Sequence, residues 1–287
     1  MSHVITKKAE DILDKEFKCL NAGFVRLVDY MGGDESIVQA ARVSYGKGTK
    51  SVSEDRILLR YLMRHMHTTP FEMVELKFHV KLPIFVARQW IRHRTASVNE
   101  LSGRYSIMKD EFYVPESNAI KRQSVKNKQG RSEDEVPTEL RQKVLEVLLS
   151  DQRYTYEHYE NFLKDNIARE LARINLPLSL YTEWYWKIDL HNCLHFLRLR
   201  LDKHAQYEIR VYAEAMAEIL KCVVPMAWEA FEDYQLLGEH FSRMELSVLT
   251  DYLDISRITK EVLKQYGLTG LEADEFLGKL NRIKKKD

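Results

Sequence analysis

The sequence predicts one α+β domain in which many helices pack around a small mixed or antiparallel sheet. The chain has 287 residues, which is enough to bury a large core without covalent staples. Hydrophobic residues make up 45% and charged residues 30%, the balance of an ordinary globular protein. Segments with a strand pattern are few, and helical segments separate them without the strict strand–helix alternation that a parallel sheet requires.

The charge balance and the absence of long apolar runs exclude several classes of protein. The 44 Lys and Arg residues nearly cancel the 43 Asp and Glu residues, so the chain cannot coat nucleic acid through total charge. The longest stretch without Asp, Glu, Lys or Arg is 174–182, far shorter than the roughly 18 residues of a membrane helix. The first ten residues are already charged, unlike a secretory signal, and the three cysteines are scattered. We therefore expect a cytoplasmic protein.

Residue periodicity predicts the elements in order along the chain. The clearest strand is 74–82, where Val, Leu and Phe alternate with Glu, Lys and His. Shorter strands are expected at 24–30 and 181–188, and a loop at 95–103, which is rich in small polar residues. Pro83 suits the first turn of a helix. Helices are expected at 34–43, 53–66, 84–93, 138–164, 167–175, 190–202 and 205–224.

Two segments lie outside the expected core. Residues 116–134 contain only three apolar side chains, which predicts a polar surface insertion. Residues 239–287 are expected to form a helical C-terminal extension that ends in a run of lysines. The sequence thus predicts a single domain, 1–287, whose core spans about 20–235.

The segment 88–105 carries the strongest functional signal. It reads RQWIRHRTASVNELSGRY and holds four arginines and one acidic residue. Guanidinium groups offer paired donors that match phosphate oxygens. The alternative is a solvated basic helix face. Gly103 allows close approach of a backbone, and Asn99 and Glu100 can read a base or a ribose, so we favour an anion site.

This segment resembles the flavin-dependent thymidylate synthases. Arg92-His93-Arg94, Ser97, Asn99-Glu100, Ser102 and Arg104-Tyr105 match the nine fixed positions of the family signature RHRxxSxNExSxRY. The resemblance extends over approximately residues 20–235, through 41–44, 67–71, 175–177 and 197–208. It implies methylation of dUMP to dTMP, with methylenetetrahydrofolate as carbon donor and NADPH as reductant through a bound FAD. It also implies a homotetramer with ligand sites shared between subunits.

The resemblance further implies which residues bind each ligand. The residues implied for dUMP are Gln89, Trp90, Ile91, Arg92, Glu100, Leu101, Ser102, Gly103, Arg104, Arg173 and Arg200. Those implied for FAD are Ser44, His67, Thr69, Arg92, His93, Arg94, Glu100, Asp189, Leu190, His191 and His195. Arg92 and Glu100 would serve both ligands.

The physical chemistry of these residues is consistent with the implied ligands. The dUMP phosphate and the FAD pyrophosphate both need fixed donors, and the arginines can supply them. The chain has no G-x-G-x-x-G after a strand, so FAD must be held by side chains rather than a Rossmann cradle.

A catalytic role for Arg200 also follows from the resemblance. In the family scheme the matching arginine favours ionisation at N3 of the uracil and so pushes electron density toward C5. Arg198 and Arg200 lie about 200° apart on a helix, so only one of them can point inward. The resemblance selects Arg200 and leaves Arg198 facing solvent.

A covalent mechanism is not favoured. No cysteine falls in the signature, and Cys193 and Cys222 lie in apolar helical segments, where buried small side chains are the simpler interpretation. Ser102 is a weak nucleophile without an adjacent base. We expect Ser102 to position dUMP.

Two other functional classes compete with this interpretation. His191 and His195 are four residues apart, but they lack the glutamate of an H-E-x-x-H site, so no metal is predicted and a metal-dependent phosphohydrolase is disfavoured. A nucleic-acid-binding module would use Trp90 and Tyr105 as stacking platforms. The near-neutral charge of the chain argues against nucleic acid as a partner.

Overall fold

The computed structural model describes residues 4–43, 52–125, 128, 130–252, 254–255 and 257–284. Contacts divide the chain into two compact units, Met1–Phe231 and Glu232–Asp287. The first unit holds an open five-stranded sheet in the order β1-β2-β3-β5-β4, with every neighbouring pair antiparallel. This confirms the predicted fold class. The strands are β1 (Phe17–Cys19), β2 (Gly23–Met31), β3 (Glu75–Pro83), β4 (Ser97–Glu100) and β5 (Tyr181–Asp189).

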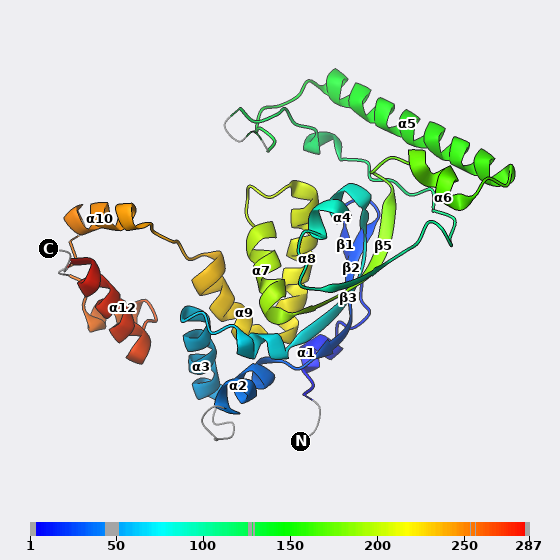
Figure 1. Ribbon diagram of the computed structural model, residues 1–287. Coiled ribbons are helices and arrows are strands. Elements are labelled where there is room, and N and C mark those ends of the chain that lie inside the picture. Colours follow the sequence, from blue (N-terminus) through cyan, green and yellow to red (C-terminus); the bar gives the residue numbers. More distant parts are fainter. Residues whose placement is uncertain are drawn as a thin grey trace. The chain divides into compact units, whose positions relative to one another are not determined.

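Helices of the first unit cover one face of this sheet. Figure 1 shows α4, α7 and α8 lying against that face, and α8 contacts β1 and β2 while α7 contacts β5. The helices and helical turns of the unit are α1 (Lys7–Glu10), α2 (Asp34–Val43), α3 (Val52–Arg64), η1 (Thr69–Met73), α4 (Ile84–Trp90), η2 (Ser117–Ala119), α5 (Thr138–Lys164), α6 (Arg169–Ala172), η3 (Arg173–Asn175), α7 (Leu190–Arg200), α8 (Tyr207–Val223) and α9 (Pro225–Phe231). Among the described helices, none is long and apolar enough to cross a membrane.

The central strands β3 and β5 form the middle of the core. Their register pairs Glu75 with Asp189 at one end and Pro83 with Tyr181 at the other. The apolar residues of β3 are buried, as their alternation predicts. Lys81 of β3 is also buried, because its ammonium group pairs with Glu111 at 2.7 Å.

The structure differs from the sequence expectations in the first unit, where α1 and α9 were not expected and three further segments also differ. The expected loop at 95–103 contains strand β4, which forms through backbone pairing with β5 although all four of its side chains are exposed. Strand β1 was not expected, because three residues are too short for a visible period. The helix expected at 167–175 is one turn of α6 followed by the 3₁₀ turn η3.

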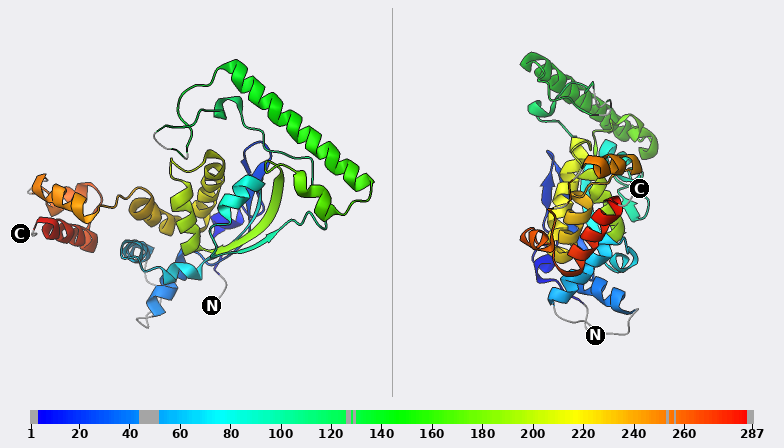
Figure 2. Two further views of the ribbon diagram at one scale, coloured as in Figure 1. Left: turned by 45° about the horizontal axis from the view of Figure 1, so that its top comes forward. Right: turned by 90° about the vertical axis from the view of Figure 1, so that its left-hand side faces the viewer.

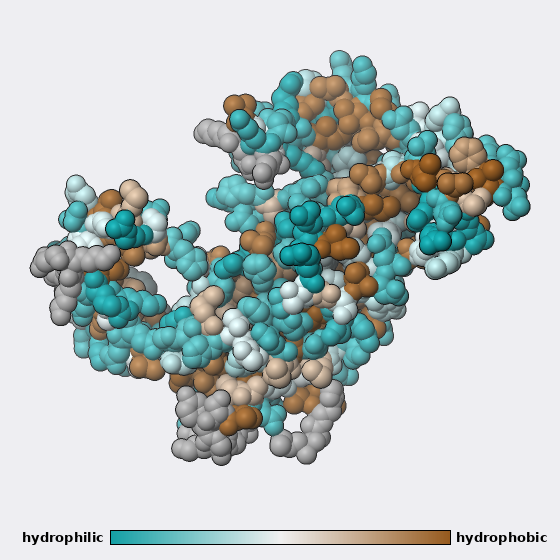
Figure 3. Space-filling model, in the orientation of Figure 1, coloured by the Kyte–Doolittle hydropathy of each residue, from teal (hydrophilic) through white to brown (hydrophobic). Residues whose placement is uncertain are grey.

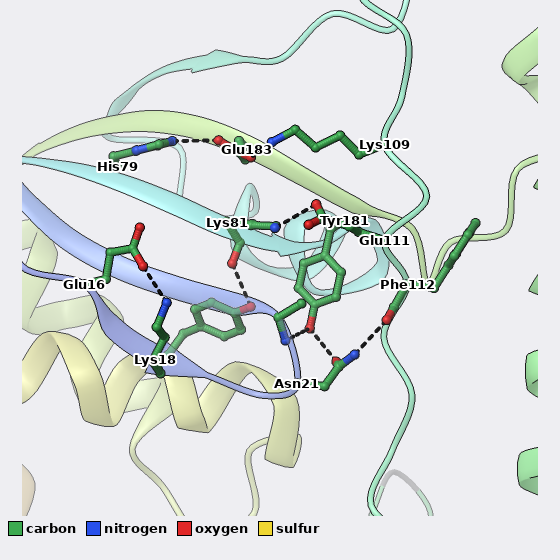
Figure 4. Close-up of polar contacts among 12 residues, drawn as sticks. Glu16, Lys18, Asn21, His79, Lys81, Lys109, Glu111, Phe112, Tyr181 and Glu183 are labelled. Carbon is green, nitrogen blue, oxygen red and sulfur yellow. Dashed lines mark hydrogen bonds and ion pairs between the residues drawn. The ribbon is translucent and has the colours of Figure 1, made fainter.

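The chain that follows β4 is pinned to the sheet by polar contacts (Figure 4). Lys109 donates to Glu183 at 3.2 Å, and Asn21 donates to the carbonyl of Phe112 at 2.8 Å. The Tyr181 hydroxyl in turn donates to Asn21 at 2.8 Å. These bonds fix the path of residues 109–112, which leave the loop after β4.

Helix α5 covers a second, smaller core. Met108, Phe112, Tyr159, Ala172 and Leu180 form a buried cluster, and Ile84 at the start of α4 packs against it. The views in Figure 2 show α5 as a long helix beside this part of the chain. Its other side exposes large apolar residues, and Figure 3 shows apolar surface gathered over it.

The C-terminal unit is built from the π-helical turn η4 (Glu232–Leu236), α10 (Arg243–Tyr252), α11 (Lys260–Gln265) and α12 (Gly270–Lys284). Thr259 caps α11 by accepting from the amide of Val262, and α10 packs against α12. The Thr250 hydroxyl donates to the carbonyl of Ile283 at 3.0 Å.

The polar insertion is anchored to the first unit by a buried carboxylate. Glu208 at the start of α8 is only 1% exposed, and it accepts hydrogen bonds from Tyr113 at 2.9 Å and from Arg131 of the insertion. Burial alone would raise the pKa of Glu208, but the hydrogen bonds from Arg131 and Gln206 and the charge of Arg131 hold this pKa below its ordinary value. Arg131 therefore links the polar insertion to α8 through its ion pair with Glu208.

This anchor can be tested by thermal and urea unfolding of Arg131→Met. Removing the guanidinium leaves the buried Glu208 carboxylate without its cation, so we expect a loss of about 1–3 kcal/mol in the free energy of unfolding. Arg122→Met removes the same charge from an exposed position of the same insertion and should change the free energy by less than about 0.5 kcal/mol. Equal losses in both variants would refute the anchor.

Candidate functional site

The site begins where α4 ends in the core. The Trp90 ring is fully buried and stacks on Phe196 of α7 at 4.7 Å between centroids. It also meets the edge of Trp186 of β5 at 5.3 Å. Because Trp90 is held on two sides, the next residues leave the core at a fixed point, and Ile91, Arg92 and Arg94 are exposed.

A cationic cavity of about 340 Å³ opens beside this segment. It contains two of the signature's arginines and Arg200, the arginine that the sequence selected on α7. Its lining residues are Arg92, His93, Arg94, Thr95, Ile188, Asn192, His195, Leu199 and Arg200. The structure thus brings together residues that are more than 100 positions apart in the sequence.

Arg200 is hydrogen-bonded to His93 in this cavity. Arg200 Nε donates a hydrogen bond to His93 Nε2 at 3.1 Å. Since an arginine can only donate, Nε2 must be the unprotonated nitrogen of that imidazole. The pKa of His93 is lowered to about 4, chiefly by burial and further by the charges of Arg200 and His195. His93 is therefore neutral at pH 7.

Helix α7 is positioned by its own N-cap. The Asp189 side chain accepts from the amide of Asn192 at 2.9 Å and from its side-chain nitrogen at 2.7 Å. His195 lies one turn further on and is exposed. Its pKa is lowered by partial burial and by the nearby charges of Arg198, His191 and Arg200.

Sequence reasoning missed the residues that complete the cavity. Asn192 and Leu199 share one face of α7 with the expected His195, at spacings of three and four residues. The helical period counted from His195 would have found both. Ile188 and Thr95 carry no comparable signal in the sequence.

A second cavity, of about 170 Å³, shares His93 and Arg94 with the first. The rest of its lining is apolar and comes from the segment before β4, from β4 itself and from β5. These residues are Ile91, Ala96, Val98, Trp184 and Trp186.

The signature's glutamate lies on β4 beside β5. The Thr182 hydroxyl donates to Glu100 Oε1 at 2.8 Å, and Glu100 is otherwise exposed. The amide of Leu101 then bonds the carbonyl of Glu183 at 2.8 Å. β4 therefore holds Glu100 at a fixed register on the sheet.

A second cluster of expected residues forms around Gly103. A Cβ on Gly103 would lie 2.9 Å from Met108 Sδ and 3.0 Å from Arg173 Cδ, so the side chains of Met108 and Arg173 pack directly on this glycine. Arg104 forms an ion pair with Glu170 at 3.1 Å, and its amide bonds the Ser102 hydroxyl at 3.3 Å. The structure thus joins Ser102–Arg104 to Arg173, as the implied dUMP set requires.

The remaining expected residues lie apart from these two clusters or outside the description. Thr69 begins η1, which packs against α7, and His67 just before it is exposed and meets the Tyr61 ring edge-on at 5.8 Å. Gln89 is half-buried on α4. Ser44 lies outside the described residues.

The burial of Trp90 and the arrangement of the histidines can be compared with the nucleic-acid and phosphohydrolase interpretations. Trp90 has no exposed surface, so it cannot stack on bases as the nucleic-acid interpretation requires. Within the described part of the chain, no three His, Cys, Asp or Glu side chains form a group that could hold a metal ion. The phosphohydrolase interpretation needed such a group around His191 and His195.

The cysteines lie away from both cavities. Cys19 and Cys193 are buried, and burial raises the pKa of Cys19 to about 12 and that of Cys193 still further. Neither thiol, nor that of Cys222, lines either cavity.

Proteins of known family that are similar to this chain are thymidylate synthases. A family model described as "Thymidylate synthase complementing protein" matches residues 26–226. A flavin-dependent thymidylate synthase from Rickettsia bellii is 55% identical over 285 residues, covering 95% of this chain and 96% of that protein. The protein of the same name from Treponema denticola is 58% identical over 268 residues, covering 93% and 98%.

A solved structure agrees with the sequence comparisons. The crystal structure of the UMP/dUMP methylase PolB from Streptomyces cacaoi, bound with 5-Br dUMP, superposes with a TM-score of 0.69. It is 33% identical and covers 78% of this chain and 100% of its own.

The protonation state of His93 can be tested by NMR titration of the histidine side chains. Its pKa of about 4 lies below the ordinary value of about 6.5. As the pH falls between these values, the unfolded chain takes up a proton that the folded chain refuses, so stability should decrease over that window. Arg200→Leu should raise the pKa of His93 only part of the way, because burial remains. A wild-type His93 that titrates near 6.5 would contradict the geometry.

Proposed function

The chain belongs to the flavin-dependent thymidylate synthases, enzymes that convert dUMP to dTMP, and we propose that it uses FAD, methylenetetrahydrofolate and NADPH for this reaction. The observation that carries the proposal is the cavity in which Arg92, His93 and Arg94 of the signature meet Arg200. We assign the activity to the first unit, since the family match falls within it.

The donors in the cavity suit a pyrophosphate. Arg92 and Arg94 are exposed, and no carboxylate of the described chain lies within ion-pair distance of either. Their guanidinium groups are therefore available to the diphosphate of FAD. His195 of α7 and Asp189 at the end of β5 are the further contacts that we propose for other parts of the cofactor. The bound flavin would supply hydride chemistry that no side chain of this protein can supply.

The cluster around Gly103 suits the phosphate of dUMP. Arg173 is exposed, packs directly on Gly103, and has no ion-pair partner among the residues described. Ser102 adds a hydroxyl, and Arg104 adds a second guanidinium beside it. Glu100, held by Thr182, would read the nucleoside between the phosphate and the flavin.

Arg200 is the residue that activates the uracil. It is half-buried, and although burial lowers the pKa of Arg200, a guanidinium stays charged at pH 7. A cation fixed in a partly dry cavity stabilises negative charge that develops on the uracil ring. This role needs no covalent adduct, which agrees with the placement of all three cysteines outside the cavities.

The separation of the two clusters supports a site shared between subunits. Arg92–Arg94 precede β4 and Ser102–Arg104 follow it, and the three residue steps from Ser97 to Glu100 span roughly 10 Å. Neither cavity lined by Arg94 includes Arg173. A second copy could bring the two clusters onto one ligand pair.

The exposed apolar side of α5 offers surface for such an assembly. It carries large side chains that no described part of the chain covers, which is typical of interfaces. These residues are Leu140, Val147, Tyr154 and Phe162. We propose the homotetramer on this basis together with the resemblance, and a cytoplasmic location because the three cysteines are free.

The reaction is tested by tritium release from dUMP labelled at C5, in the presence of NADPH and methylenetetrahydrofolate. We expect release that depends on both cosubstrates. The purified protein should be yellow, and its flavin absorption should bleach with NADPH and return in air. A colourless protein that takes up no added FAD would refute the proposed function.

Arg200→Ala tests the assignment of the activating cation. We expect the flavin content to be retained and tritium release to fall by about 100-fold or more, since one preorganised charge contributes about 3 kcal/mol. Arg198→Ala removes the same charge from the same helix without altering the cavity lining and should keep turnover within about threefold. Unchanged turnover in Arg200→Ala would remove this residue from the mechanism.

Gly103→Ala tests the phosphate site. The added Cβ would press on the side chains of Met108 and Arg173, and we expect the resulting shift of Arg173 to raise the KM for dUMP about 10-fold while FAD binding is kept. Gly278→Ala, whose Cβ would meet only the far end of Arg282 at 3.7 Å, is the matched control. If dUMP binds Gly103→Ala normally, Arg173 does not hold the phosphate.

A further inference from the structure

We propose that His93 is a positioning residue, which fixes the guanidinium of Arg200 by accepting the hydrogen bond from its Nε. This goes beyond the flavin contact that the family resemblance implies for His93. It rests on the proposed function, in which Arg200 activates the uracil.

The hydrogen bond to His93 leaves the two terminal nitrogens of Arg200 free for a ligand. An arginine has five N–H donors, and one of them, on Nε, is used by His93 Nε2 at 3.1 Å. The two terminal nitrogens of the guanidinium lie beyond this bond. Because Arg200 lines the cavity, these nitrogens are the ones available to a ligand there.

The acceptor is itself held rigidly. His93 follows the buried Trp90 by three residues, and its amide bonds the carbonyl of Trp90 at 3.0 Å. The imidazole meets Phe196 edge-on at 4.9 Å, and Phe196 stacks on Trp90. One aromatic cluster therefore orients both α7, which carries Arg200, and the residue that receives its hydrogen bond.

The electrostatic environment keeps His93 an acceptor. Burial, Arg200 and His195 all disfavour its protonation, so the lone pair on Nε2 is present at neutral pH. A protonated imidazole would repel Arg200 and would offer no lone pair. The positive charge around the cavity thus keeps His93 neutral and so maintains its hydrogen bond with Arg200.

Without this bond Arg200 would sample several rotamers, since its side chain has four rotatable bonds and no other hydrogen-bond partner among the described residues. Misplacement of a catalytic group by about 1 Å can cost about 100-fold in rate. The bond should therefore affect kcat more than the binding of FAD.

A double-mutant cycle on the full-length, FAD-loaded enzyme tests this role. His93→Phe keeps a ring against Phe196 but removes the acceptor, and His93→Gln restores an acceptor oxygen. Arg200→Lys keeps the positive charge but lacks the Nε donor. Readouts are kcat, the KM for dUMP and the number of flavins bound per chain.

We expect His93→Phe to lower kcat about 10- to 100-fold with flavin content unchanged, and His93→Gln to stay within about threefold of wild type. In the Arg200→Lys background, His93→Phe should lower kcat by less than about twofold more, because the bond is already absent. Equal loss in both backgrounds, loss of flavin from His93→Phe, or no rescue by His93→Gln would overturn the proposal.

These outcomes are separable from failure of the proposed function. If Arg200→Ala turns over as fast as wild type, the mechanism itself is wrong, whatever His93 does. If Arg200→Ala is inactive and the His93 variants show no coupling to Arg200, only the positioning role is refuted.

Discussion

The packing of the Trp90 ring is the interaction on which the rest of the site depends. Its ring lies against Phe196 of α7 and Trp186 of β5, so one side chain ties the end of α4 to the sheet and to the helix that carries Arg200. Truncation of such a buried aromatic costs about 3–5 kcal/mol. The segment with Arg92, His93 and Arg94 is therefore a short, partly exposed continuation of a tightly packed aromatic cluster, which restricts its position.

Positive charge is concentrated here in a chain that is almost neutral overall. The fold brings Arg92, Arg94 and Arg200 to one cavity and neutralises none of them with a carboxylate from the cavity's own lining. Gathering like charges in this way opposes folding, and the anions that we propose to bind here would offset this cost. His93 limits the repulsion by staying neutral, so the same residue serves both the stability and the geometry of the site.

Much of this could be read from the sequence, and the failures have physical causes. The alternation in β3 and the helical periods of α5 and α8 are local signals, so these elements and the antiparallel α+β class were predictable. β4 was not, because its strand conformation comes from pairing with a segment 84 or more residues later rather than from its own exposed side chains. The site residues were found through a motif, whereas the bond between His93 and Arg200 is a tertiary contact without any sequence signature.

The burial of the cysteines has a pharmacological consequence. Cys19 and Cys193 lie in the interior and their thiols resist ionisation, so electrophiles that capture a reactive thiolate would find no target in either cavity. An inhibitor that must form a covalent bond to sulfur in these cavities should therefore have no effect here. If the proposed ligand contacts are right, an inhibitor of this cavity would be an anion with a flat ring that takes the place of these ligands beside Arg92, Arg94 and Arg200.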